Sequence, residues 1–271
     1  MIRTFLCILG LSSLVLSAEP PAAVTRSQWQ GCEQESFVLE GRNCRVVKPA
    51  TPAPGKPWVW RPEFFEAFNQ ADRALLGEGF HLCYIDLKNS FGCPSSLDLM
   101  DRFYDHVTTT YGVSKKTSLF GFSRGGLYSM NWANRHPDRV AIIYLDAAVC
   151  DFKSWPGGKG KGKGSPGDWK KLMADYGFKT EQEALDYKLN PIDNLKAIAA
   201  AKIPILSVCG DADGTVPYLE NSAILKERYT ALGGKMEMIL KPGVDHHPHS
   251  LPDPAPIVKA VTAANVPGAQ P

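Results

Sequence analysis

The stretch that decides the fold is TSLFGFSRGGLYSMNWAN, residues 117–134. Its first four residues are typical of a buried strand, and the apolar spacing of residues 127–134 predicts a helix. Between them lies GFSRG, residues 121–125, which matches the pattern G-x-S-x-G. That pattern places a serine on a strained strand-to-helix turn, with glycines where other side chains would clash. The pattern is short enough to arise by chance, so the strand before it and the helix after it give it its weight.

Strands and helices alternate on both sides of this turn, which predicts an α/β fold with a mostly parallel, doubly wound sheet. Apolar strands near the middle of the chain fit a parallel sheet with helices on both faces. A hairpin near the start adds an antiparallel edge, and a polar, proline-rich lead-in precedes it at residues 19–34. About eight strands are expected, at residues 36–39, 44–47, 57–60, 80–85, 117–120, 140–145, 203–208 and 236–240. Helices are expected at residues 64–76, 97–109, 127–134, 219–232 and 256–263, with short helical patterns at 182–188 and 192–199.

One connection is far longer than the others. Residues 146–201 separate the sixth expected strand from the seventh and contain SWPGGKGKGKGSPGDWKK, residues 154–171. The spacing of its glycines matches neither of the common phosphate-binding loops. Because the insertion starts at the carboxyl end of a strand, where open α/β sheets bind ligands, we expect it to form a cap above Ser123.

A serine hydroxyl is a weak nucleophile unless a histidine takes its proton and a carboxylate orients that histidine. On a fold with this serine turn, the acid and then the histidine follow the serine along the chain, on loops after later strands. Residues 209–217 follow one such strand and hold Asp211 and Asp213. Residues 241–249 follow the next strand and hold His246 and His247. Order and placement both agree with serine-based nucleophilic chemistry.

Three segments, GFSRGG, CGDADGTVP and KPGVDHHPHSL, resemble the serine, acid and histidine segments of the α/β-hydrolase superfamily. The chain is most similar to exported bacterial members of the prolyl-oligopeptidase-like, dienelactone-hydrolase-like and acetylxylan-esterase-like groups. The resemblance implies an α/β-hydrolase fold over one domain, residues 19–271, that includes the insertion. It implies Ser123 as nucleophile and Asp213 as acid, because the acid usually stands in G-x-x-D-x-x-V-P. Asp211 is the alternative acid.

The histidine segment departs from the family pattern at one position. The family usually has a small glycine directly before its histidine, where this chain has Asp245. We expect His246 to be the base, with His247 as the alternative. The same segment offers a second interpretation, since Asp245, His246, His247 and His249 are all residue types that bind metals. They lie too close in sequence to converge easily on one ion, so we expect neither a metal ion nor an organic cofactor.

Two backbone N–H groups are expected to hold the oxyanion of the reaction. One belongs to Arg124, directly after the serine. The other comes from the end of the strand at residues 57–60, where Pro62 has no N–H and leaves Arg61 or Trp60. The Arg61 side chain is also a candidate for binding a substrate carboxylate, or else forms a surface salt bridge with a neighbouring glutamate. Trp60 is a candidate for lining the pocket, or else packs in the core.

The start of the chain resembles an export signal. Residues 1–18 carry a positive charge, an apolar run too short to span a membrane and then Ala18, which suits cleavage. We therefore expect an exported protein without stable membrane insertion. Six cysteines follow the signal, and neighbouring strand ends make Cys150 and Cys209 a candidate disulfide. A net charge of +2 argues against a nucleic-acid partner.

Positive charge gathers in the insertion, where residues 153–171 hold six lysines and one acidic residue. Lys159, Lys161 and Lys163 are candidates for attracting an anionic ester such as a uronic-acid-containing glycan; alternatively, they keep a loop soluble.

The sequence predicts a secreted serine hydrolase that cleaves an acetyl or methyl ester on a polysaccharide or oligosaccharide. The alternatives are a small prolyl-oligopeptidase-like peptidase or aminopeptidase, and a non-catalytic glycan-binding protein on a hydrolase scaffold. The sequence gives no oligomeric state.

Overall fold

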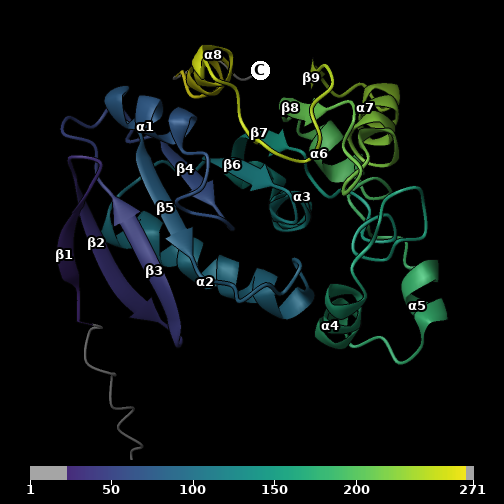
Figure 1. The fold of residues 1–271 in the computed structure, drawn as a ribbon. Coiled ribbons are helices and arrows are strands. Elements are labelled where there is room, and N and C mark those ends of the chain that lie inside the picture. Colours follow the sequence, from purple (N-terminus) through teal and green to yellow (C-terminus); the bar gives the residue numbers. More distant parts are fainter. Residues whose placement is uncertain (1–22, 267–271) are drawn as a thin grey trace, which may run out of the picture.

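The fold is built on one mixed sheet, in a computed structural model that describes residues 23–266. Nine strands lie in the order β1-β2-β3-β5-β4-β6-β7-β8-β9 (Figure 1). Strands β1 to β3 pair antiparallel, as do β3 and β5, while β5, β4, β6, β7, β8 and β9 form a parallel series. Their bounds are Thr25–Trp29, Cys32–Leu39, Arg42–Val47, Trp58–Arg61 (β4), His81–Ile85 (β5), Thr117–Phe122 (β6), Val140–Asp146 (β7), Ile205–Gly210 (β8) and Met236–Lys241 (β9).

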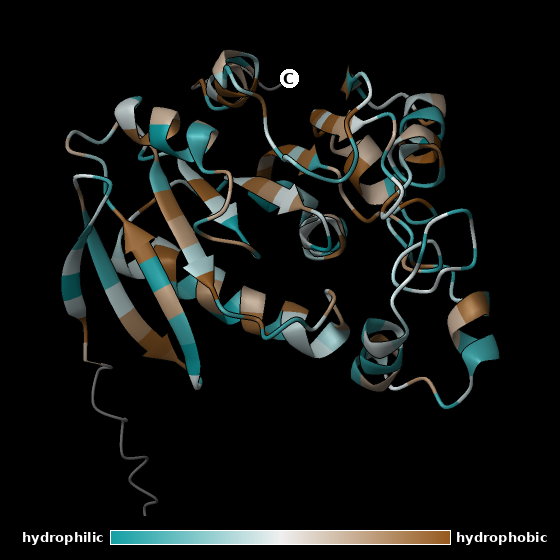
Figure 2. Cartoon of the chain, viewed as in Figure 1, coloured by the Kyte–Doolittle hydropathy of each residue, from teal (hydrophilic) through white to brown (hydrophobic). Residues whose placement is uncertain are grey.

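Helices cover both faces of this sheet. They are α1 (Gln70–Gly77), α2 (Pro94–Thr110), α3 (Gly125–Arg135), α4 (Pro166–Tyr176), α5 (Glu181–Asp186), α6 (Lys196–Ala200), α7 (Ser222–Ala231) and α8 (Ala255–Ala264). One apolar cluster joins the sheet to α2, α3, α6 and α7, and a second joins the opposite face to α1 and α8. Apolar residues accordingly run along the central strands (Figure 2). The predicted doubly wound α/β sheet is confirmed.

Three local expectations are wrong. The lead-in expected at residues 19–34 contains β1 and the start of β2, an exposed edge hairpin in which polar side chains face water. The helix expected at 64–76 begins only at Gln70, because residues 64–69 form turns in which Phe64 and Phe68 have positive φ angles. Helix α4 was not expected, because prolines and glycines surround a segment with only two buried side chains, Trp169 and Leu172.

The structure also decides two side-chain expectations, one for Trp60 and one for a cysteine pair. Trp60 is fully buried and packs against Trp58, Phe103 and Trp132, which agrees with the second of its two expected roles, packing in the core. Cys150 follows β7 and Cys209 lies near the end of the neighbouring strand β8, yet both are free thiols, so the expected disulfide is absent from this pair. Burial raises the pKa of Cys209 to about 11, so it stays protonated at neutral pH.

The insertion lies between β7 and β8 and carries α4, α5 and α6, and its role as a cap above Ser123 stays a prediction. Its helices α4 and α5 lie at the opposite end of the molecule from the β1–β3 hairpin (Figure 1). A small apolar cluster joins it to the main domain, with Phe152, Trp169 and Leu172 packed near Phe91 and Leu127.

The expected export signal at residues 1–18 lies outside the described residues. Between residues 23 and 266, no helix has the length and apolar character needed to cross a membrane.

Candidate active site

Ser123 occupies the turn between β6 and α3 in a left-handed conformation, with a φ angle of 48°. This region is uncommon for residues other than glycine, so the surrounding hydrogen bonds must hold it. The Ser123 N–H donates to the Asp146 carbonyl over 2.9 Å. The Ser123 carbonyl accepts from the N–H groups of Gly126 (3.0 Å) and Val149 (2.9 Å). The end of β7 and the loop after it therefore fix the serine.

Three loops bring Ser123, His246 and Asp213 together. The serine Oγ lies 3.0 Å from Nε2 of His246, and Nδ1 of that ring lies 2.8 Å from Oδ2 of Asp213. All three residues are buried. The second oxygen of Asp213 accepts the N–H groups of Thr215 (2.9 Å) and Val216 (2.7 Å), which fixes the carboxylate. The structure thus assembles the three residues that the sequence favoured.

The alternative residues lie elsewhere in the same loops. Asp211 is exposed and its Oδ1 accepts the Gly243 N–H over 2.6 Å, so it shapes the histidine loop. His247 is exposed and its ring stacks on Phe68, with centroids 5.7 Å apart.

Asp245, which stands where the family usually has glycine, ties the histidine loop to the acid loop. Its Oδ1 accepts the N–H groups of Gly214 (2.9 Å) and His246 (2.7 Å). These two donors lower the pKa of Asp245, because they stabilise its charged form. The departure from the family pattern therefore has a structural role here.

A second histidine and carboxylate lie beside the first pair. Nδ1 of His249 is 2.8 Å from Oδ1 of Asp146, and both residues are buried. The other oxygen of Asp146 accepts the Ser250 N–H (2.8 Å) and the Tyr144 hydroxyl. Burial raises the pKa of Tyr144 well above its usual range, so this hydroxyl remains a donor. Asp146 thus binds the serine turn through its backbone and the histidine loop through its side chain.

Asp146 is not among the site residues predicted from the sequence. The available signal was its position, since it is the charged residue directly after the apolar run VAIIYL at the carboxyl end of a central strand.

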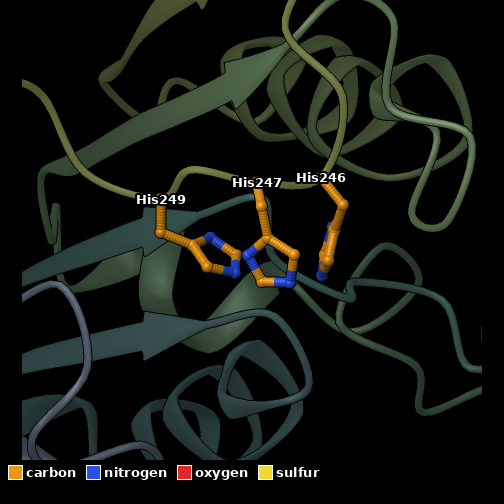
Figure 3. Close-up of side chains that lie close together, drawn as sticks. All are labelled: His246, His247 and His249. Atoms are coloured by element: carbon orange, nitrogen blue, oxygen red, sulfur yellow. The ribbon is translucent and has the colours of Figure 1, made fainter.

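A small cavity of about 120 Å³ opens beside Ser123. Its walls are mostly aromatic or histidine side chains, from Phe64, Ala67, Phe68, Phe122, Ser123, His246, His247 and His249. Figure 3 shows the three histidines projecting from one loop toward the same side. The two phenylalanines of the 62–69 loop belong to the segment expected to be helical, so this wall of the cavity was not predicted from the sequence.

The Arg61 side chain has neither of the roles expected for it. It is fully buried, and its Nη1 donates to the carbonyls of Phe65 (3.2 Å) and Ala67 (2.8 Å). It forms an ion pair with the equally buried Asp72 over 3.4 Å, and its guanidinium lies 4.0 Å from the centre of the Phe122 ring. Arg61 therefore holds the loop that carries the aromatic wall of the cavity and reaches neither a substrate nor the surface.

The insertion flanks the acid loop. The Lys163 N–H donates to the Gly214 carbonyl (3.2 Å), the Lys161 N–H donates to the Glu220 carboxylate, and the Lys159 ammonium pairs with Glu181 over 2.7 Å. The three lysine side chains are exposed, and none of them lines the cavity beside Ser123.

Arg124, the expected oxyanion donor, directly precedes Gly125 at the start of α3. The first N–H groups of a helix have no partner within the helix.

Solved structures with this fold include both esterases and peptidases. The acetyl xylan esterase from Paenibacillus sp. R4 is 16% identical with a TM-score of 0.64, and the match covers 90% of this chain and 88% of that one. Acetyl xylan esterase 1 from Thermoanaerobacterium sp. JW/SL YS485 is 15% identical with a TM-score of 0.61, covering 92% and 89%. A putative dipeptidyl aminopeptidase IV from Bacteroides ovatus is 14% identical with a TM-score of 0.61, covering 90% of this chain.

The chain spans only 35% of the length of that peptidase, so the peptidase's whole activity does not transfer with the fold. A search of curated proteins finds no match. The model of the prolyl oligopeptidase family matches residues 95–260, which include Ser123, Asp213 and His246. The chain therefore belongs to the prolyl oligopeptidase family and is a serine hydrolase with the α/β-hydrolase fold.

Proposed function

We propose that this protein is an exported serine esterase that removes a small acyl group, acetyl in first place, from a polysaccharide or oligosaccharide. The observation that carries the proposal is the Ser123–His246–Asp213 chain of hydrogen bonds, at 3.0 and 2.8 Å, beside an aromatic cavity of about 120 Å³. A methyl ester is the second candidate, since its small methyl group also suits such a cavity.

The proposed mechanism uses these three residues as a catalytic triad. Ser123 Oγ attacks the ester carbonyl while His246 Nε2 takes its proton, and Asp213 holds the other ring nitrogen and stabilises the imidazolium. The oxyanion is placed at the Arg124 N–H, with the Arg61 N–H as the proposed second donor. His246 then gives its proton to the leaving alcohol. Water then attacks the acyl-enzyme while His246 takes its proton, and His246 returns that proton to Ser123 Oγ as the acid leaves.

The composition of the cavity favours an ester over an aminoacyl substrate. An aminopeptidase must bind a free ammonium group, for which a carboxylate is the usual partner. None of the residues that line the cavity is acidic. The nearby carboxylates of Asp213 and Asp146 already bind His246 and His249. Aromatic walls instead suit a methyl group.

The test is a substrate panel on purified protein: acetylated glycans, methyl-esterified glycans, p-nitrophenyl acetate, p-nitrophenyl octanoate and aminoacyl amides. We expect acetyl esters to be cleaved fastest and octanoate poorly, because the cavity holds only a small group. Ser123→Ala should lower kcat by about 10³-fold or more, as loss of a triad member does elsewhere.

Each alternative has its own result in this panel. Cleavage of aminoacyl amides above esters would establish the peptidase, and glycan binding without any turnover would establish the binding protein. Equal rates for Ser123→Ala and the unmodified protein on every substrate would reject the triad. Export is proposed from residues 1–18 alone, and the amino-terminal sequence of protein recovered from the producing cell tests it.

A further inference from the structure

Three of the six histidines in the chain gather at one point beside Ser123. His246, His247 and His249 extend from the loop after β9 to the same side (Figure 3). The centroids of their rings lie 4.8 to 4.9 Å apart, and one ring nitrogen from each lies within 4.8 Å of the others. The expectation that such close neighbours do not converge is wrong for these three. Asp245 is not part of the group, because its Oδ1 accepts backbone N–H groups.

Two of the three imidazoles are already oriented as metal ligands. Nδ1 of His246 lies 2.8 Å from Asp213, and Nδ1 of His249 lies 2.8 Å from Asp146. A carboxylate at Nδ1 keeps the proton on that nitrogen and leaves a lone pair on Nε2, which in His246 faces Ser123 Oγ over 3.0 Å. The same carboxylate–histidine arrangement orients and strengthens the histidine ligands of protein zinc sites.

His247 supplies the third nitrogen and the freedom to close the site. Zinc–nitrogen bonds of about 2.0–2.1 Å put two ligands of a tetrahedral ion roughly 3.4 Å apart. Nitrogens that now span up to 4.8 Å must therefore approach one another. The exposed His247 ring stacks on Phe68 and meets the two neighbouring histidines edge-on, and it can turn to do so.

We propose that His246, His247 and His249 bind one divalent transition-metal cation, Zn²⁺ in first place, and that the bound ion reversibly blocks the hydrolase. Imidazole nitrogens suit zinc, copper and nickel, and three ligands leave a fourth position for water or Ser123 Oγ. His246 Nε2 lies 3.0 Å from Ser123 Oγ, so an ion on this nitrogen occupies the lone pair that must receive the serine proton. The inhibition rests on the proposed function, whereas the binding does not.

Binding is tested by calorimetric titration of zinc chloride into the full chain without a histidine tag. We expect one ion per chain. His247→Phe keeps an aromatic ring against Phe68 but removes both nitrogens, and should weaken zinc binding about tenfold or more. His106→Phe, on α2 and outside the cluster, is the matched control and should bind zinc like the unmodified protein.

Inhibition is measured on p-nitrophenyl acetate, with the basal rate of each variant as its own reference. We expect zinc to inhibit the unmodified protein, a chelator to restore it, and His247→Phe to need about tenfold more zinc for half-inhibition. No saturable zinc binding, or equal affinity in His247→Phe, would overturn the metal site. Zinc binding by a protein that cleaves no ester would reject the proposed function and leave the metal site standing, and ester cleavage by a protein that binds no zinc would do the reverse.

Discussion

Gly126 sets how closely helix α3 approaches the loop after β7. A Cβ atom on Gly126 would lie 2.7 Å from the Val149 carbonyl oxygen and 2.8 Å from the Ala148 side chain. The Val149 N–H also donates to the Ser123 carbonyl, so the loop cannot retreat without moving the serine. We expect Gly126→Ala to lower the free energy of unfolding by about 1–3 kcal/mol, the usual cost of overpacking, and to lower kcat with it. Urea unfolding and the rate on p-nitrophenyl acetate measure both effects.

Gly125→Ala is the matched control in the same helical turn. A Cβ atom there would lie 3.5 Å from the Glu63 side chain, an ordinary contact. Alanine favours a helix over glycine by up to about 1 kcal/mol, so this variant should be as stable as the unmodified protein or more so. The second glycine of the G-x-S-x-G pattern is thus expected to tolerate alanine better than the glycine after it. Equal destabilisation by both substitutions would contradict the steric argument.

The sequence predicts Ser123, Asp213 and His246 because their placement follows from local rules. Each residue lies in the loop after a strand, and the parallel strands β6, β8 and β9 end at the same edge of the sheet, so their loops meet there. The roles of Arg61 and Asp146 follow no local rule. Which carbonyl or N–H each side chain reaches depends on how the 62–69 loop and the histidine loop fold over it.

At the scale of elements, the loop at residues 62–69 shows why apolar spacing predicted a helix where the chain forms turns. Phe64, Phe65 and Phe68 match a helical pattern with Leu75 and Leu76. Two of these phenylalanines line the cavity instead, and Arg61 binds the carbonyls that a helix would have used. The Arg61–Asp72 ion pair is fully buried, so removing one partner would leave an unpaired charge in the core. A periodic pattern cannot distinguish residues that face the core from residues that face a cavity.

The insertion carries the proposed attraction of an anionic ester. Lys161 and Lys163 have exposed side chains beside the acid loop, while Lys159 is partly neutralised by Glu181. We expect the triple variant with glutamine at these positions to lower kcat/KM for an anionic ester about fivefold to tenfold at low ionic strength, at the weak end of electrostatic steering. At high salt the difference should shrink, because ions screen exposed charges. Rates on matched neutral and anionic acetyl esters at two salt concentrations measure it.

The control variant removes three lysine charges that lie away from the acid loop. Lys115 precedes β6, Lys235 precedes β9 and Lys259 lies on α8, and all three are exposed. Their replacement by glutamine should leave both rates unchanged. If both triple variants slow both esters equally, the lysines of the insertion keep a loop soluble and attract no substrate.

At the scale of the molecule, the central parallel strands and their helices were predictable, and the edges were not. Strands β6, β7 and β8 are fully buried, so their continuous apolar runs stand out in the sequence. Strand β1 is exposed at four of its five positions, and pairing with β2 rather than burial holds it in the sheet. Such a strand has the composition of a loop. The prolines and glycines around α4 hide that helix in the same way.

His81 couples the stability of the whole sheet to pH. It is the first residue of β5, between β3 and β4, and is 5% exposed. Burial lowers the pKa of His81 to about 4, because its charged form loses water there. The unfolded chain takes up this proton near pH 6.5, whereas the folded chain does so only near pH 4. Stability is therefore fully present above pH 6.5 and falls as the pH drops toward 4.

The loss assigned to His81 is on the order of 2–3 kcal/mol between pH 6.5 and pH 4. His81→Gln keeps a neutral polar side chain but removes the titration. We expect the free energy of unfolding of this variant to depend less on pH across that window, after allowance for the constant packing difference measured at pH 8. Urea unfolding of both proteins at half-unit steps from pH 4 to pH 8 gives the two curves. Curves that stay parallel throughout would show that His81 is already protonated in the folded protein at pH 6, and that burial does not hold it neutral.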